Sequence, residues 1–144
     1  MIRPLAACLL AAVAFAAPVG MTAQAAAPPN VMGYTQSDLS GLWQGVFYSN
    51  GGLTLFDAFI SDANGTLTGS TTELNTFGDA NTAFLLADIA GTARNGRVSF
   101  EKTYNGVGGQ SHTVRYQGTV SRDGRRITGT WSLDGVSDQF EMVR

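Results

Sequence analysis

Cysteine and proline are almost absent from most of this 144-residue chain. The single cysteine is Cys8, and all four prolines precede Asn30. No disulfide can form with only one cysteine, and no thiolate metal site can be built after residue 8. A segment without proline can also hydrogen-bond each of its strands on both sides. The chain after Asn30 must therefore be stabilised by its hydrophobic core alone.

Charge is scarce too, at 9 basic and 11 acidic residues. Nucleic-acid binding requires a basic face that neutralises phosphates. The only basic cluster consists of Arg122, Arg125 and Arg126, and it flanks a predicted turn. We interpret this cluster as a solvated turn and expect no nucleic-acid partner.

The N-terminus has the three parts of an export signal. Arg3 supplies the charge, an apolar run extends from Leu5 to Ala17, and Ala23-Gln24-Ala25 offers a cleavage site. The run is too short to span a bilayer. We therefore predict a signal peptide over 1–25 and a periplasmic or secreted protein that is not embedded in a membrane. Its removal would leave 8 basic and 11 acidic residues, a net charge of −3.

A second motif overlaps this leader. Leu5-Ala6-Ala7-Cys8 resembles a bacterial lipobox, but the apolar region follows the cysteine instead of preceding it. We interpret the match as chance. The remaining length fits one domain, so we expect a flexible leader over 26–37 and a folded domain over 38–144.

The folded part reads as a series of short strands. Apolar and polar residues alternate in segments spaced about 10 to 15 residues apart, as in antiparallel all-β domains. Asn64-Gly65, Asn95-Gly96, Asp123-Gly124 and Asp134-Gly135 supply the turn chemistry of tight hairpins. A longer link, 74–82, is predicted to fold over one end of the sheet. The predicted strands are 40–48, 53–61, 65–73, 83–92, 96–104, 111–120, 125–133 and 137–144.

Closure into a barrel follows from this order. Eight consecutive strands with short links can close on themselves, which removes both exposed edges. We therefore predict an all-β fold, a single eight-stranded antiparallel up-and-down barrel. The interior of a barrel of this size is filled by side chains or holds one small ligand.

Three short motifs resemble the calycin superfamily of small barrels, which includes lipocalins and avidins. Gly41-Leu42-Trp43 is similar to the G-x-W start of the first strand, whose tryptophan plugs the closed end. The segment 64–69 resembles the glycine-rich second hairpin of avidins, and 127–133 resembles the avidin strand that ends in a ligand-facing tryptophan. The resemblance implies a barrel with Trp43 at its floor and a ligand at its mouth.

The chain also departs from the avidin ligand set. The resemblance implies a polar residue where Gly45 stands, although Ser49 could match the serine of the following loop. Avidins use several tryptophans, whereas this chain has only Trp43 and Trp131. We therefore do not expect biotin as the ligand.

The residues that could carry chemistry are predicted to gather at one mouth. Lys102 shares a face with Val98 and Phe100, so its ammonium must be paired or solvated, and Glu73 is the expected partner. A structural ion pair at the rim is one interpretation. The other is that this pair orients a polar head group above an apolar pocket. The predicted ligand-binding residues are Glu73, Lys102, Tyr104, His112, Tyr116 and Trp131.

Catalysis has little support in the sequence. His112 is the only histidine, and its neighbour Ser111 points to the opposite face of the predicted strand. No nucleophile elbow or paired-histidine zinc motif occurs. We predict no catalytic residues, no metal site and no cofactor.

Three functions therefore remain open. The leading hypothesis is a barrel that binds a small, partly apolar ligand. The second is a protein-interaction module, such as an inhibitor of an exported hydrolase. The third is a barrel-type cyclase or isomerase. A filled interior would favour the interaction module and an open interior would favour the ligand binder.

Overall fold

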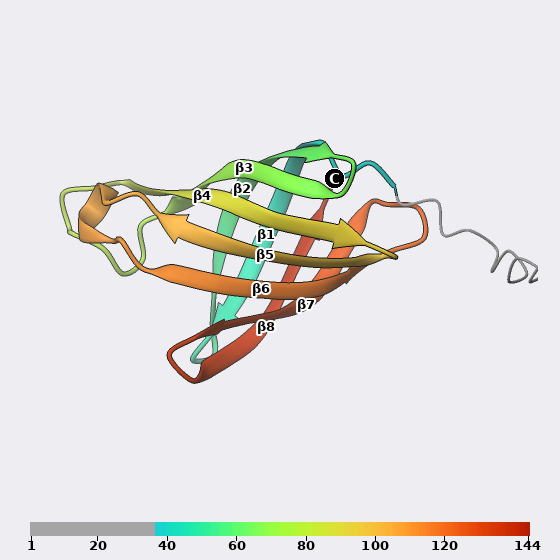
Figure 1. Ribbon diagram of the computed structural model, residues 1–144. Helices are drawn as coiled ribbons and strands as arrows, with labels where there is room; N and C mark the ends of the chain where they lie inside the picture. Colours follow the sequence, from blue (N-terminus) through green and yellow to red (C-terminus); the bar gives the residue numbers. More distant parts are fainter. Residues whose placement is uncertain (1–36) are drawn as a thin grey trace, which may run out of the picture. The chain divides into compact units, whose positions relative to one another are not determined.

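Eight β-strands follow one another along the chain of the computed structural model, which describes residues 37–144 (Figure 1). The predicted signal peptide, Cys8 and all of the predicted leader except Ser37 lie outside the described residues. Within them no helix has the length and apolar character needed to cross a membrane. The strands are β1 (Gly41–Ser49), β2 (Gly52–Ala63), β3 (Thr66–Leu74), β4 (Phe84–Arg94), β5 (Arg97–Tyr104), β6 (Thr113–Val120), β7 (Arg126–Leu133) and β8 (Val136–Val143).

The strands form a closed barrel in sequence order. Each strand pairs antiparallel with the next, and β1 pairs with β8 to complete the wall. The predicted all-β, up-and-down barrel is confirmed, and every strand begins and ends within two residues of its predicted position. The shift that affects a predicted site residue concerns the sixth strand, which begins at Thr113 instead of residue 111, so Ser111 and His112 belong to the preceding loop.

Four hairpins are closed by two-residue turns. Asn50-Gly51, Asn64-Gly65, Asn95-Gly96 and Asp134-Gly135 each have two consecutive positive φ angles, the backbone of a type I′ turn. The turn at Asp123-Gly124 differs from the prediction, because only Gly124 has a positive φ. Five residues connect β6 and β7 there, and the backbone N–H of Gly124 donates to the carbonyl of Ser121.

One end of the barrel, which we call the floor, is sealed by apolar side chains. Trp43 is buried and its indole Nε1–H donates to the carbonyl of Leu39 at 2.9 Å. Ile60, Leu67 and Met142 are also buried in this core. The closed floor agrees with the position predicted for Trp43.

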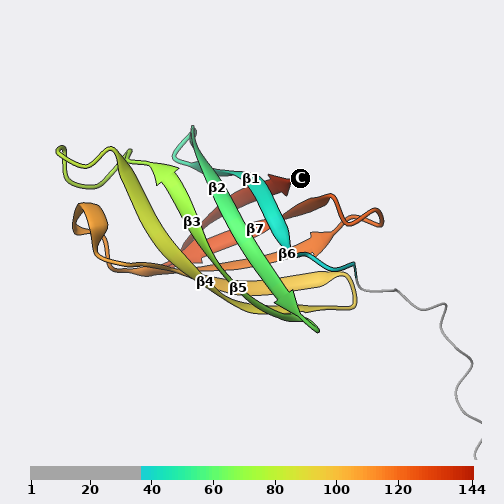
Figure 2. The same ribbon diagram turned by 90° about the horizontal axis from the view of Figure 1, so that it is seen from above.

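The opposite end, which we call the mouth, is bordered by two long loops. One loop spans 75–83 and the other spans 105–112 and contains the short 3-10 turn η1 (Val107–Gly109). The two loops lie side by side at the same end of the barrel (Figures 1 and 2), where Asp79 donates its N–H to the carbonyl of Gly108 at 2.9 Å. The predicted folding of the first loop over one end is thereby observed.

Candidate binding site at the barrel mouth

A buried ion pair lies inside the barrel below the mouth. The ammonium of Lys102 on β5 donates to the Oε2 of Glu73 on β3, and both residues are at most 2% exposed. The predicted partner is therefore the observed one. The ion pair does not lie at a solvated rim as predicted, because aromatic side chains close the space above it.

Aromatic rings supply much of the surroundings of Lys102. Its Nζ lies 5.2 Å from the ring centre of Phe47, 5.1 Å from that of Phe56 and 4.7 Å from that of Tyr104. Ring faces attract cations at such distances. Burial lowers the pKa of Lys102, and the Glu73 carboxylate opposes part of this shift. The pair thus needs both its own contact and the rings to offset the cost of burying charge.

Tyr104 connects the ion pair to the mouth. Its hydroxyl donates to the Oε1 of Glu73 at 2.5 Å, so both carboxylate oxygens of Glu73 are occupied. Burial raises the pKa of Tyr104, and the negative charge of Glu73 adds to the shift. Tyr104 is therefore held as a neutral phenol, with its hydroxyl turned toward Glu73.

A cup of about 210 Å³ opens above these residues. Four of the lining side chains are those of Tyr104, His112, Tyr116 and Trp131, all from the predicted set. The walls are mostly aromatic, with the few polar groups that small-molecule sites usually have. The remaining lining residues are Phe47, Ser49, Phe77, Val114 and Leu133.

Tilted and edge-on rings fix the shape of the cup. The rings of Tyr104 and His112 lie 4.6 Å apart, and Phe77 from the 75–83 loop packs against both, at 5.8 Å and 6.2 Å. On the other wall, Trp131 donates its indole N–H to the carbonyl of Tyr48 at 2.9 Å. These contacts hold the walls without using the imidazole nitrogens of His112, which form no hydrogen bond with the described residues.

The barrel interior between cup and floor is filled. Phe100 stacks on Tyr116 with ring centres 4.9 Å apart, and Phe140 meets the two rings edge-on at 6.1 Å and 5.0 Å. Burial raises the pKa of Tyr116, with a further contribution from the negative charge of Glu73. A ligand therefore has room in the mouth but not along the barrel axis.

The six predicted site residues thus fall into two groups. Tyr104, His112, Tyr116 and Trp131 line the cup, whereas Glu73 and Lys102 lie beneath it and reach it through Tyr104. All six come together at one end of the barrel. The pattern of alternation was enough to place five of them, because each lies on a strand with a regular inward face, whereas His112 lies in the loop before β6.

Sequence reasoning missed other parts of the cup. Phe77 lies in a loop without periodicity, and no local signal indicates that it folds back onto Tyr104. Val114 and Leu133 lie on predicted inward faces and could have been included. Asp57 and Asp88 both point outward and are exposed, so neither contributes to the cup.

Gly45 explains why the avidin ligand set does not fit. A Cβ at this position would lie 2.1 Å from the ring of Phe56. The ring of Phe56 therefore takes the space that a polar side chain on β1 would need. The departure noted in the sequence is thus built into the packing.

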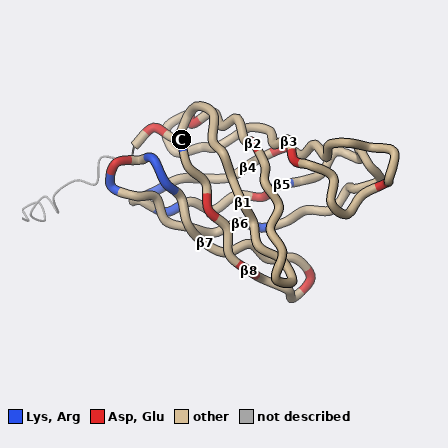
Figure 3. Tube along the Cα trace, turned by 180° about the vertical axis from the view of Figure 1, so that it is seen from behind, with Lys and Arg blue, Asp and Glu red and all other residues tan. Residues whose placement is uncertain are grey.

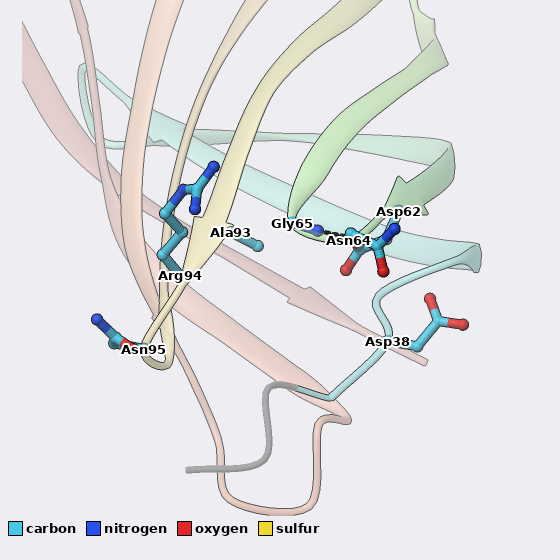
Figure 4. Close-up of a pocket in the computed structure, with 7 residues that line it drawn as sticks. All are labelled: Asp38, Asp62, Asn64, Gly65, Ala93, Arg94 and Asn95. Atoms are coloured by element: carbon cyan, nitrogen blue, oxygen red, sulfur yellow. Dashed lines mark hydrogen bonds between the residues drawn. The ribbon is translucent and has the colours of Figure 1, made fainter. Parts of the chain in front are cut away.

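A larger hollow, of about 550 Å³, lies outside the floor (Figure 4). Its carboxylates form hydrogen bonds with the nearby backbone. Asp62 accepts hydrogen bonds from the N–H groups of Leu39 and Gly65. Asp38 likewise accepts from the N–H of Ser40 at 2.8 Å. The lining has no aromatic wall, and the described residues contain no cluster suited to a metal ion. The cup at the mouth is the better candidate site.

Comparisons of the chain with models of protein families, with curated protein sequences and with solved structures find no match. The closed antiparallel barrel of eight strands is consistent with a calycin-like layout.

Proposed function

We propose that this barrel binds one small, partly apolar molecule in the cup at its mouth. The observation that carries the proposal is the aromatic cup itself, a preformed hollow whose walls are fixed by ring packing and whose polar groups are few. Sites for small molecules combine such apolar walls with a small number of oriented polar groups. The avidin-like and lipocalin-like layout supports the same end of the barrel as the ligand site.

The volume limits the size of the ligand. About 210 Å³ corresponds to roughly seven water-sized volumes of ~30 Å³ each. That space suits a single aromatic ring with one substituent or a short acyl chain, and it is too small for a long lipid. We expect dissociation constants in the micromolar to millimolar range, because a ligand of this size offers few atoms to contribute to binding.

The polar groups open to the cup set its chemistry. His112 offers an imidazole, Ser49 a hydroxyl and Tyr116 a phenol, whereas the Tyr104 hydroxyl is already bound to Glu73. We infer that the ligand stacks on Tyr104 and Trp131 and places a polar or anionic group near His112. Glu73 and Lys102 act as positioning residues that hold Tyr104 in place.

Tryptophan fluorescence can test the proposal, because the chain has two tryptophans at opposite ends of the barrel. In the Trp43→Phe variant, Trp131 is the only reporter and lies in the cup. Phenol, benzoate, benzylamine and hexanoate should produce a saturable change, greatest for the ring compounds with a neutral or anionic group. The matched Trp131→Phe variant reports from the floor and should not respond. No saturable response from Trp131 to any of the four probes would overturn the proposal.

The protein-interaction module is a second candidate, because of two specific observations. Aromatic rings fill the barrel interior, and the mouth exposes Phe77 and Val107 in its loops and Val136 at the start of β8. Apolar loop tips of this kind can insert into a partner protein. Capture of an exported hydrolase by the wild type and its loss in a Phe77→Ser variant would favour this function over ligand binding.

A further inference from the structure

The two halves of the barrel's outer wall differ in charge and in apolar exposure. Strands β5 to β8 present charged residues outward, and two cross-strand ion pairs lie among them, Arg115 with Glu101 and Arg126 with Glu141. On β1, β2 and β4 many outward positions are apolar, whereas β3 has threonine or serine at every outward position except Leu74. The carboxylates of Asp57 and Asp88 are the only charges on that half between its two ends. In Figure 3 the tube along β1 and β2 accordingly carries few coloured segments.

Apolar side chains at the mouth end of β1 to β4 form a continuous surface. Val46 pairs with Leu55 across β1 and β2, and Leu74 pairs with Phe84 across β3 and β4. Leu55 and Leu74 lie one residue beyond the Phe56–Glu73 pair, so the four side chains form one row across four strands. We call this row and its exposed apolar neighbours the apolar wall. Its large exposed members are Tyr48, Leu53, Leu55, Leu74, Phe84 and Leu86, with exposed fractions from 37% to 59%. Leu42 and Phe59 are also exposed, but the polar row of Gln44, Asp57 and Thr72 separates them from the wall.

This pattern is unusual for a strand that faces water on its outer side. Antiparallel strands with one wet face alternate apolar and polar residues, as β5 to β7 do here. On β2, however, Leu53, Leu55 and Phe59 point outward while Phe56 and Ile60 point inward. Both faces of β2 are therefore apolar over much of its length, as expected for a strand covered on both sides.

The area of the apolar wall matches the apolar part of one side of a protein interface. Its six large members are about half exposed on average, which at roughly 150–200 Å² per large side chain gives on the order of 500 Å². Each partner in a standard interface buries about 800 Å², of which roughly 60% is non-polar. A hollow of about 360 Å³ lies at the border of the wall, with Leu55, Leu74 and Phe84 on its apolar side and Gln44, Asp57 and Thr72 on its polar side.

We propose that the apolar wall is a self-association surface, on which a second copy of this chain packs with its own apolar wall. A two-fold contact lets one patch serve both partners. The polar side chains of Gln44, Asp57 and Thr72 lie beside the central row and would form part of the polar rim that surrounds an interface core. The cup faces away from this contact, along the barrel axis, so that binding in the cup and self-association use different surfaces.

Sedimentation equilibrium on the purified protein from micromolar to millimolar concentration tests the proposal. The wild type should show the mass of two chains. Leu55→Glu places like charges in the centre of the contact and should shift the protein to monomer, as should the independent variant Leu74→Glu. Thr130→Glu adds the same charge to the polar half of the outer wall and should leave the dimer intact. Circular dichroism checks that every variant keeps its β-structure.

The proposal is overturned by a wild type that is monomeric at every concentration, or by an assembly that Leu55→Glu and Leu74→Glu leave unchanged. A larger assembly that these variants dissociate would still support the wall as a contact between copies. Vesicles of phosphatidylcholine provide the competing test. A monomer that sediments with them, and that Leu55→Glu releases, would assign the wall to a lipid surface instead.

Discussion

The guanidinium of Arg144 lies 4.7 Å from the centre of the Trp43 ring. Its nitrogens also donate to the carbonyls of Asp38, Ser40 and Gly124, at 2.8 to 2.9 Å. One side chain thus joins the segment before β1, the turn between β6 and β7, and the floor tryptophan. The floor is closed by these contacts as well as by burial of Trp43.

Replacing Arg144 should therefore weaken the floor. We expect Arg144→Ala to lower the free energy of unfolding by about 1–2 kcal/mol, because it removes a ring contact and three charge-assisted hydrogen bonds. Arg144→Lys keeps the charge without the planar fork and should recover only part of the loss. Denaturant unfolding followed by tryptophan fluorescence provides the measurement. Equal stability of Arg144→Ala and the wild type would contradict this role.

The buried ion pair predicts a non-additive pattern of stability. Lys102→Met and Glu73→Gln alone each leave one charged partner uncompensated, at a cost of about 3–5 kcal/mol. The double variant removes both charges and keeps an acceptor for the Tyr104 hydroxyl, so it should be much closer to the wild type. A double-mutant cycle from denaturant unfolding measures the coupling. Additive losses would show that the pair contributes nothing as a pair.

Alkaline pH should unfold the barrel through its buried tyrosines. The pKa values of Tyr104 and Tyr116 are raised in the folded protein, so above pH 10 the unfolded chain binds fewer protons than the folded one. The stabilisation is complete below pH 10 and is lost as the pH rises further. Lys102 acts in the opposite sense below its ordinary pKa of 10.5, because its folded pKa is lowered.

Phenolate absorbance and circular dichroism, recorded together, check this expectation. The two buried phenols should ionise only in the transition in which the β-structure is lost. Tyr116→Phe should make stability fall less steeply above pH 10. Ionisation of all the tyrosines in a barrel that is still folded would contradict the prediction.

Gly45 allows a test of the packing that distinguishes this barrel from avidins. Gly45→Asn forces a side chain against the Phe56 ring and should destabilise the fold by about 1–3 kcal/mol, as overpacking does. Gly52→Ala is the matched control, because the nearest atom to its new Cβ lies 3.4 Å away. Adding Phe56→Leu to Gly45→Asn should restore part of the loss. Thermal unfolding of the variants provides the comparison.

The fold was predictable from sequence because its signals are local. Asn-Gly and Asp-Gly pairs favour the positive φ angles of tight hairpin turns, and the alternation in β5 to β7 separates Phe100 from Glu101 without tertiary information. The pairing of Lys102 with Glu73 could be predicted for the same reason, since the alternation showed on which face of its strand each residue lies. His112 shifted from strand to loop because the end of a strand has no signal as strong as a turn.

The rest depended on packing between distant segments. Phe77 reaches the cup through the path of the 75–83 loop, and nothing near Phe77 in the sequence specifies that path. The depth of the Glu73–Lys102 pair depends on how far Phe47 and Phe56 extend over it. In β2, Leu53 and Leu55 break the alternation that sequence reasoning requires, since both faces of this strand are apolar.

The pairing between β1 and β8 has a further consequence for how the barrel folds and opens. Seven strand pairings join neighbours in sequence through at least six residue pairs each, whereas β1 and β8 share four, from Gln44–Val143 to Phe47–Phe140. These four residue pairs also close the longest loop in the domain. Because closing a long loop costs conformational entropy, we expect these pairs to form only after the hairpins have formed. The β1–β8 junction is therefore the place where neighbouring strands of the barrel are joined by the fewest residue pairs. We expect the amide hydrogens between β1 and β8 to exchange with solvent first, while the seven hairpins are still folded.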